Sequence, residues 1–170
     1  MKLSLKVTDT GRDGNKVHLL TWNPEKWPDL TDDLINATKM VLDVGTKLIT
    51  QWSVGPRKND IFPGDKVFLL RQGTDRRGII AAGIVFSEIF QEPHWDGTDR
   101  DGNYVQYLLT KMTSIEDRLA IETLETYKDP TSGNSFEIDW DTIYSSGRTL
   151  SDHDGQELLN LWLQHTSDLP

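Results

Sequence analysis

Apolar residues recur along the chain with two different periods, and each period indicates a different element. Alternation with a period of two, or a short apolar run, is typical of a strand, whereas spacing near 3.6 is typical of a helix. The segment between residues 11 and 15 is rich in glycine and polar turn formers, so it separates the first two strands. The pattern predicts strands at residues 2–8, 17–22, 48–53, 66–70, 79–87 and 104–110.

The predicted strand at residues 79–87 differs from the others because it is almost continuously apolar. Such a run is typical of a strand that is buried on both faces. Gly83 interrupts the run, and a glycine inside a strand indicates a bend or bulge of the kind that barrels need. The run therefore favours a small closed barrel.

Helical spacing is found at two places. The first helix follows Trp27, carries acidic residues in its first turn and stops near Gly45. Ser151 is suited to cap a second helix near the end of the chain. We expect polar loops at residues 91–103 and 128–135 and an irregular or short helical segment at 115–127. Together these elements predict an α+β fold built around a small barrel, with the whole chain, residues 1–170, forming one domain.

Composition excludes several classes of protein. The chain has six Trp, five Phe and four Tyr, which is enough for a core and argues against disorder. It has no cysteine, which excludes disulfides, thiol nucleophiles and cysteine-ligated metal. No apolar run approaches the roughly 20 residues that cross a bilayer, and residues 1–6 lack the apolar core of a signal peptide. We therefore expect a cytoplasmic protein with no membrane partner.

The charge is unevenly distributed. The formal net charge is −9, yet residues 47–77 carry seven Lys or Arg against three Asp. Because salt screens charges beyond about 8–10 Å, a local basic surface can still bind phosphate. The charge pattern alone favours the simpler interpretation, a solvated acidic surface on the second half of the chain.

No pattern in the sequence supports catalysis. The four histidines are far apart, so no pair has the spacing of metal ligands. Residues 97–103 resemble a calcium loop only in part, since Gly97 and Leu108 stand where acidic ligands are needed. A glycine-rich phosphate loop and a nucleophile elbow are both absent. We predict no cofactor, no metal and no enzymatic activity.

Three tryptophans have unusual surroundings. Trp22 and Trp52 end predicted strands and Trp95 lies in a polar loop, each beside small or polar residues. Aromatic faces stack on a nucleobase for roughly 1–3 kcal/mol per base. The alternative is that the three rings are core or lid residues.

An ordered set of short motifs resembles the EVE domain of the PUA-like superfamily, a relative of the YTH domain. The similarity is greatest to the EVE-like domains at the N-terminus of modification-dependent HNH restriction endonucleases. It covers about residues 17–165 and includes Trp140 and residues 145–147 with the helix that follows. Its main motifs are LTWNPEKW at residues 20–27, WSVG at 52–55, PGDKVFLLRQG at 63–73, RGIIAAG at 77–83 and EPHWD at 92–96.

The resemblance implies a bent β-barrel with flanking helices and a pocket for a flipped base, 5-methylcytosine or 5-hydroxymethylcytosine in double-stranded DNA. The residues that match by position imply an aromatic cage of Trp22, Trp52 and Trp95. Readers of the base edge would be Asn23, Ser53 and Asp96. Phosphate contacts would be Arg57, Lys58, Arg71, Arg76 and Arg77.

The chain departs from the pattern in two respects. Residues 1–16 form an N-terminal extension, and no HNH segment follows the domain. We therefore expect a reader that directs a nuclease located in another domain or subunit. Two alternatives stay open: an RNA-binding PUA-like module, and a protein-interaction domain that uses its acidic face.

Overall fold

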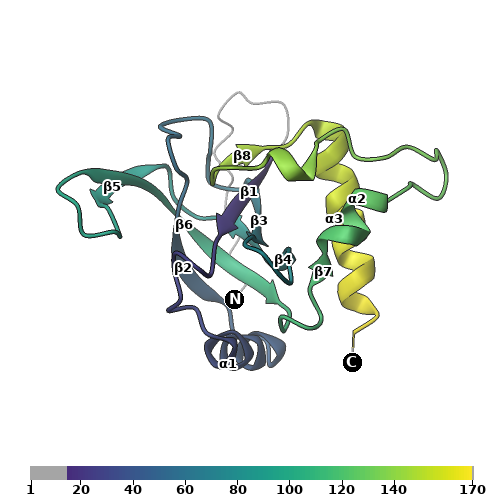
Figure 1. Cartoon of the computed structure of the whole chain (residues 1–170), viewed down its shortest axis with the longest axis horizontal. Helices are drawn as coiled ribbons and strands as arrows, with labels where there is room; N and C mark the ends of the chain where they lie inside the picture. The colour runs from purple at the N-terminus through teal and green to yellow at the C-terminus, as the bar shows by residue number, and fades with distance from the viewer. Residues whose placement is uncertain (1–14, 170) are drawn as a thin grey trace, which may run out of the picture.

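The computed structural model describes residues 15–169 and contains a mixed sheet flanked by helices (Figure 1). The predicted strand at residues 2–8 and all but the last two residues of the extension lie outside the described residues. The strands follow the order β2-β6-β4-β3-β1-β8, with β5 paired to β6 and β7 paired to β4. Their bounds are β1 Val17–Trp22, β2 Leu48–Ser53, β3 Lys66–Arg71, β4 Gly78–Val85, β5 Phe90–Pro93, β6 Asp101–Met112, β7 Leu119–Ala120 and β8 Arg148–Thr149.

The helices confirm two of the sequence predictions. Helix α1, Asp32–Asp43, begins after Thr31, whose hydroxyl accepts a hydrogen bond from Leu34 N at 3.2 Å. Helix α3, Asp152–Ser167, begins after Ser151, whose hydroxyl accepts from Asp154 N at 3.1 Å. The segment at 115–127 contains the short helix α2, Ile121–Thr126, and a 3₁₀ turn follows at Trp140–Thr142.

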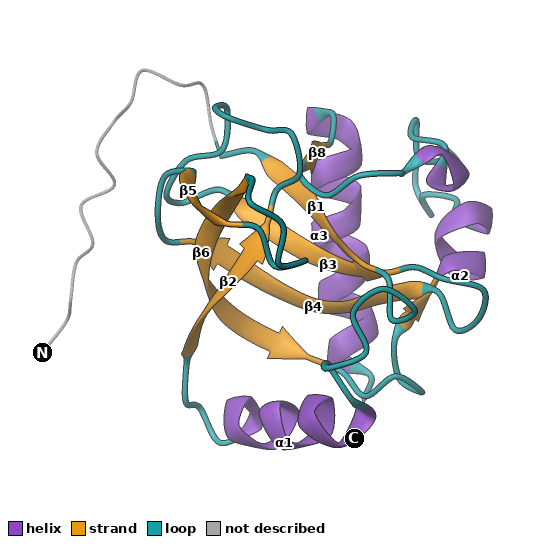
Figure 2. Cartoon of the chain, turned by 60° about the vertical axis from the view of Figure 1, so that its left-hand side comes forward, coloured by secondary structure: helices purple, strands orange, loops and turns teal. Residues whose placement is uncertain are grey.

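The sheet is strongly bent, so its edge strand β2 approaches β1 (Figure 2). Trp52 Nε1 on β2 donates to Thr21 O on β1 at 3.0 Å, which links the two strands across the bend. The register of β4 against β6 shifts between Ala82 and Gly83, where the glycine was expected to mark a bulge. A Cβ on Gly83 would lie 2.6 Å from Leu108 O, so only glycine fits there without movement. The fold is α+β and built on a strongly bent sheet, as predicted.

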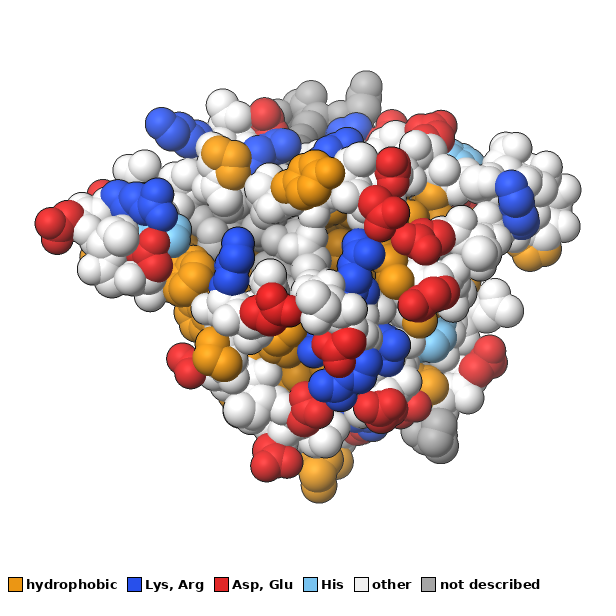
Figure 3. Space-filling view, in the orientation of Figure 1, with side chains coloured by type: hydrophobic (Ala, Val, Ile, Leu, Met, Phe, Trp, Pro, Cys, Tyr) orange, Lys and Arg blue, Asp and Glu red, His pale blue; other side chains and the backbone are white. Residues whose placement is uncertain are grey.

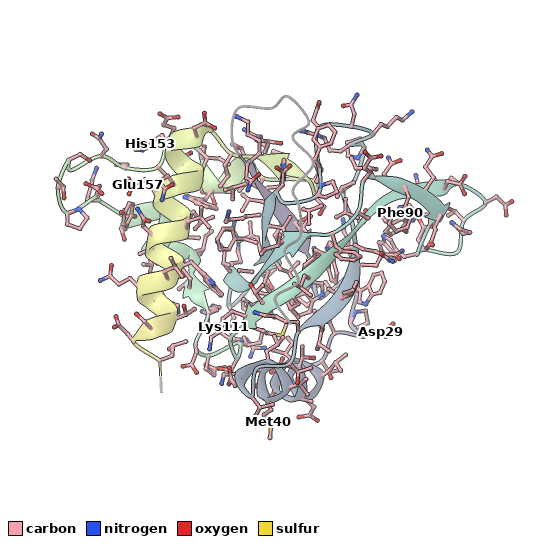
Figure 4. The ribbon with its side chains drawn as sticks, turned by 180° about the vertical axis from the view of Figure 1, so that it is seen from behind. Asp29, Met40, Phe90, Lys111, His153 and Glu157 are labelled. Carbon is pink, nitrogen blue, oxygen red and sulfur yellow. The ribbon has the colours of Figure 1, made fainter. Side chains whose placement is uncertain are left out.

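Strands β1 and β3 are buried on both faces because two hydrophobic clusters lie on opposite sides of the sheet. Leu20 and Leu69 pack in the cluster inside the bend, together with Ile35 of α1. Leu19 and Phe68, one residue away on each strand, pack in the other cluster against α3. Figure 1 shows α3 against one side of the sheet and α1 across the lower end of the bend. Figure 4 shows Met40 on the outer side of α1, pointing away from the sheet.

Two sequence predictions are wrong in detail. Only residues 94–100 of the predicted loop at 91–103 are a loop, because β5 and the start of β6 form a hairpin in which Gln91 pairs with Asn103. The run at 79–87 is buried on both faces only in its first half, since Ile84 and Phe86 are exposed. Within residues 15–169, no helix combines the length and apolar character needed to cross a membrane.

Candidate functional site

A cavity of about 570 Å³ opens where the ends of β1 and β2 meet the tip of the β5–β6 hairpin. The segment that precedes β8 forms the remaining side. The residues lining it are Thr21, Trp22, Asn23, Lys26, Trp27, Gln51, Trp52, Ser53, Gly55, Gln72, Pro93, Trp95, Tyr104, Tyr144, Ser145 and Ser146. Figure 3 shows a face that is hollowed near its centre, with Lys and Arg side chains around the hollow and Asp and Glu gathered mainly below and to the right.

Trp22 forms the deepest aromatic wall. Its side chain is only 3% exposed and belongs to the core cluster inside the bend. Trp22 Nε1 donates to Trp27 O at 2.9 Å, and the Arg71 guanidinium carbon lies 5.5 Å from the Trp22 ring centroid. Trp22 is therefore both a core residue and part of the cavity wall.

The other aromatic walls form a row. Trp27 lies between Trp52 and Trp95, with centroid distances of 6.0 Å and 5.1 Å. Trp95 is 43% exposed, and its backbone N–H donates to the Tyr104 hydroxyl at 3.1 Å. The three rings extend from the half-buried Trp52 to the exposed Trp95. The structure thus brings the predicted Trp22, Trp52 and Trp95 together and adds Trp27.

Trp27 was not among the predicted site residues. It lies in the segment that leads into α1. The turn after β1 carries it inward, because Lys26 N and Trp27 N both donate to Asn23 O, at 3.1 and 3.0 Å. The Trp-x-x-x-x-Trp spacing of residues 22 and 27 was the available signal.

Asn23 and Ser53 line the cavity, as predicted for readers of a base edge. Asn23 Oδ1 accepts from Glu25 N at 2.9 Å, and Ser53 Oγ accepts from Gly55 N at 3.2 Å. Gln72, which the sequence analysis missed, lines the cavity beside Asn23 and donates through Nε2 to Ile143 O. Each of these side chains is thus held by a backbone group.

Asp96 does not join them. Its carboxylate accepts from the Thr98 hydroxyl at 2.7 Å and from Arg100 Nη2 at 2.9 Å, and it lies 2.8 Å from His94 Nδ1. The Thr98 hydrogen bond and the neighbouring Arg100 and His94 hold the pKa of Asp96 well below its usual range. Asp96 shapes the hairpin tip and is absent from the cavity lining. Its side chain therefore does not lie where a reader of the base edge was predicted.

Arg71 also does not lie where a phosphate contact was predicted. Its side chain is buried, with the residue 4% exposed, and Nη1 donates to the carbonyl oxygens of Asp75 and Arg76. Burial lowers the pKa of the guanidinium. A phosphate cannot approach this side chain, which supports the Trp22 ring and the following turn instead.

The remaining predicted phosphate contacts differ in availability. Arg76 Nε lies 3.2 Å from Asp75 Oδ2, and Arg76 Nη1 lies 3.4 Å from Glu116 Oε1. Arg77 Nη1 lies 3.2 Å from Asp141 Oδ1, so both arginines are held in ion pairs. Arg57 donates to the Thr149 hydroxyl at 3.0 Å.

Two lysines have no such constraint. Lys58 is exposed, and Lys26 is exposed at the cavity. Neither forms an ion pair with any residue in the described range 15–169. Lys26 was not among the predicted contacts.

The rim next to β8 is fixed by hydrogen bonds that cross the barrel. Ser146 Oγ donates to Ser53 O at 2.6 Å and accepts from Thr21 N at 3.0 Å. Gly147 N donates to Leu19 O at 2.8 Å, with φ of 92°. Tyr144, in the same segment, is nevertheless 85% exposed. The backbone is anchored while the Tyr144 ring projects at the mouth.

Comparison with known proteins yields similarity in structure only. No family model matches the sequence, and no curated protein matches it. A hypothetical protein from Leishmania major superposes with a TM-score of 0.55 at 13% identity, covering 90% of this chain and 98% of that one. Human THYN1, solved in complex with 5-methylcytosine-containing DNA, superposes with a TM-score of 0.52 at 13% identity, covering 86% of this chain and 97% of that one. This chain has the PUA-like fold. At this level of identity the similarity establishes the fold alone.

Proposed function

We propose that this chain binds DNA that carries a modified cytosine, 5-methylcytosine or 5-hydroxymethylcytosine, and takes the extruded base into the cavity. The observation that carries the proposal is the set of tryptophans around one opening, with Trp22 and Trp52 oriented by hydrogen bonds to backbone carbonyls. The structural neighbour solved with 5-methylcytosine DNA supports the choice of ligand.

The energetics are consistent with a flipped base. Extrusion from a duplex costs a few kcal/mol, and contacts inside the pocket must offset that cost. Stacking contributes roughly 1–3 kcal/mol per base, and preorganised rings lose little freedom when they bind. The cavity volume of about 570 Å³ is in the range of small-ligand pockets.

We assign recognition, not cleavage, to this chain, and we propose that the bound complex directs a nuclease in another domain or subunit. The support is the resemblance to the reader domains of modification-dependent endonucleases. The described part of the chain holds no group of three or more His, Asp or Glu side chains placed to bind a metal ion.

A binding panel tests the proposal. One duplex would carry cytosine, 5-methylcytosine, 5-hydroxymethylcytosine, glucosylated cytosine or N6-methyladenine at one position, alongside matched RNA. The proposal predicts the tightest binding for DNA with a 5-substituted cytosine. Tighter binding to RNA would favour the RNA-binding alternative. A lack of nucleic-acid affinity even at low salt would favour the protein-interaction alternative.

The two exposed lysines without ion pairs in the described range, Lys26 at the cavity and Lys58 after β2, should determine the salt dependence of binding. We expect Lys26→Ala with Lys58→Ala to weaken binding to all sequences alike, because both are available for phosphate. Each lost phosphate contact should reduce the slope of log K against log salt by about 0.9. Arg76→Ala with Arg77→Ala removes the same charge from ion-paired positions and serves as the matched control. A larger slope change in the control pair would place the DNA over Arg76 and Arg77.

The exposed ring of Tyr144 should contribute to the same complex. We expect Tyr144→Ala to weaken binding to the modified duplex roughly ten-fold, because the ring can stack on the nucleotide next to the extruded one. Tyr144→Phe keeps the aromatic face and should retain the affinity. Since the ring is 85% exposed, neither variant should alter thermal melting. Unchanged affinity in Tyr144→Ala would remove this ring from the interface.

A further inference from the structure

Two side-chain amides lie next to each other at the ends of neighbouring parallel strands. Strands β1 and β3 pair in parallel up to Trp22 and Arg71, and Gln72 N donates to Trp22 O at 2.7 Å. Asn23 and Gln72 are the residues that follow on each strand, and both line the cavity. Neighbouring strands are about 4.8 Å apart, so both amides can reach the edge of one small ligand.

The backbone determines which end of each amide is free. Asn23 Oδ1 accepts from Glu25 N, so Nδ2 is the free end and it donates. Gln72 Nε2 donates to Ile143 O, so Oε1 is the free end and it accepts. Neither amide can be reversed, because an N–H needs an acceptor and a carbonyl needs a donor. Among residues 15–169 neither free atom has a hydrogen-bond partner.

A donor beside an acceptor matches a base whose exocyclic amino group adjoins an unprotonated ring nitrogen. Cytosine has this edge, with the N4 amino group donating and N3 accepting. Thymine has the opposite edge, with O4 accepting and N3–H donating. Adenine presents the same order of donor and acceptor as cytosine. The two amides therefore distinguish bases by their hydrogen-bonding edge and not by the size of the ring system.

We propose that Gln72 Oε1 accepts from the N4 amino group and that Asn23 Nδ2 donates to N3, so that the site rejects thymine. This inference rests on the proposed function and adds its specificity. Thymine is 5-methyluracil, so a pocket that recognised only a 5-methyl group would also accept an ordinary base of every DNA. A reader of 5-methylcytosine needs a second contact at positions 3 and 4, and the two amides supply it.

The test uses two duplexes of the same sequence. One carries 5-methylcytosine and the other carries thymine at the same position, each opposite an abasic site. Neither base then has to break a pair, so any difference in Kd reflects the pocket. A third duplex carries cytosine at the same position. We expect wild-type protein to bind 5-methylcytosine roughly ten- to a hundred-fold more tightly than thymine, the usual scale for a reversed hydrogen-bonding edge.

Asn23→Asp provides a change of preference that structural damage cannot produce. The aspartate keeps an oxygen for Glu25 N and replaces the free donor by an acceptor, which suits the N3–H of thymine. We expect the preference for 5-methylcytosine over thymine to fall at least ten-fold. Gln72→Met should also lower it, whereas Gln91→Met should not, because Gln91 is an exposed hairpin glutamine outside the cavity.

The outcomes separate this inference from the function on which it rests. Equal wild-type binding of 5-methylcytosine and thymine, both tighter than cytosine, would overturn the amide assignment and leave the pocket as a reader of the methyl group. An unchanged preference in Asn23→Asp and Gln72→Met would also overturn it. Wild-type binding of 5-methylcytosine no tighter than cytosine would overturn the proposed function, and the inference with it.

Discussion

Trp52→Ala should reduce the preference for a modified duplex by about ten- to a hundred-fold, while weak binding to any duplex persists. The ring is a wall of the cavity and contacts Trp27, so its loss removes about 1–3 kcal/mol of stacking. General binding should remain because phosphate contacts do not require an extruded base. Fluorescence anisotropy with modified and unmodified duplexes measures both quantities.

Two further variants distinguish a role of Trp52 in binding the base from a role in stabilising the fold. Trp52→Phe keeps a flat face and loses the hydrogen bond to Thr21 O, so it should retain most of the preference. Trp140→Ala removes a buried tryptophan of the cluster facing α3 and should lower the free energy of unfolding by about 3–5 kcal/mol. Its folded fraction should keep the preference unchanged. If Trp52→Ala stays folded and still prefers the modified duplex, Trp52 does not contact the base.

Asp65→Ala should destabilise the fold by about 3–5 kcal/mol, because the carboxylate is buried and accepts hydrogen bonds from a buried imidazole and two backbone N–H groups. His18 is completely buried and its Nε2 lies 2.7 Å from Asp65 Oδ2. The carboxylate also accepts from Lys16 N and Phe62 N, each at 3.0 Å. Without it, two backbone donors and an imidazole lose their acceptor, and each costs about 1–3 kcal/mol.

Urea unfolding of the whole chain measures this loss. Asp65→Asn keeps an acceptor of the same shape and should lie between wild type and Asp65→Ala. Asp99→Ala removes a carboxylate that is exposed in the hairpin and should stay within about 0.5 kcal/mol of wild type. An Asp65→Ala midpoint equal to that of Asp99→Ala would show that the buried network does not stabilise the fold.

The sequence predicted those elements whose pattern reflects local burial. Strands β1 and β2 and helices α1 and α3 were predicted because one face or both faces pack on a core. The β5–β6 hairpin was missed because its outer part extends from the barrel, so residues such as Gln91 and Glu92 are exposed and show no alternation. Strand β8 has two residues, too few to form a pattern.

The site was predicted in part for the same reason. Trp22 and Trp52 were identified because each ends a strand beside polar residues. Gln72 and Tyr144 were missed because their position depends on the parallel pairing of β1 with β3 and on the return of the chain to β8, which are long-range contacts. Arg71 was expected to contact phosphate because it matches the resembled family by position, yet its side chain is buried. Its burial depends on the turn that follows β3, which no local pattern reveals.

Extrusion of the modified base into the cavity is tested most directly by the fluorescence of 2-aminopurine placed beside 5-methylcytosine in a duplex. A 2-aminopurine that loses its stacking neighbour becomes brighter. We expect the signal to rise with wild-type protein in parallel with binding, and the rise to be absent with Trp52→Ala at equal occupancy. A flat signal alongside tight, modification-dependent binding by the wild type would show that the base stays in the stack, which would contradict the account.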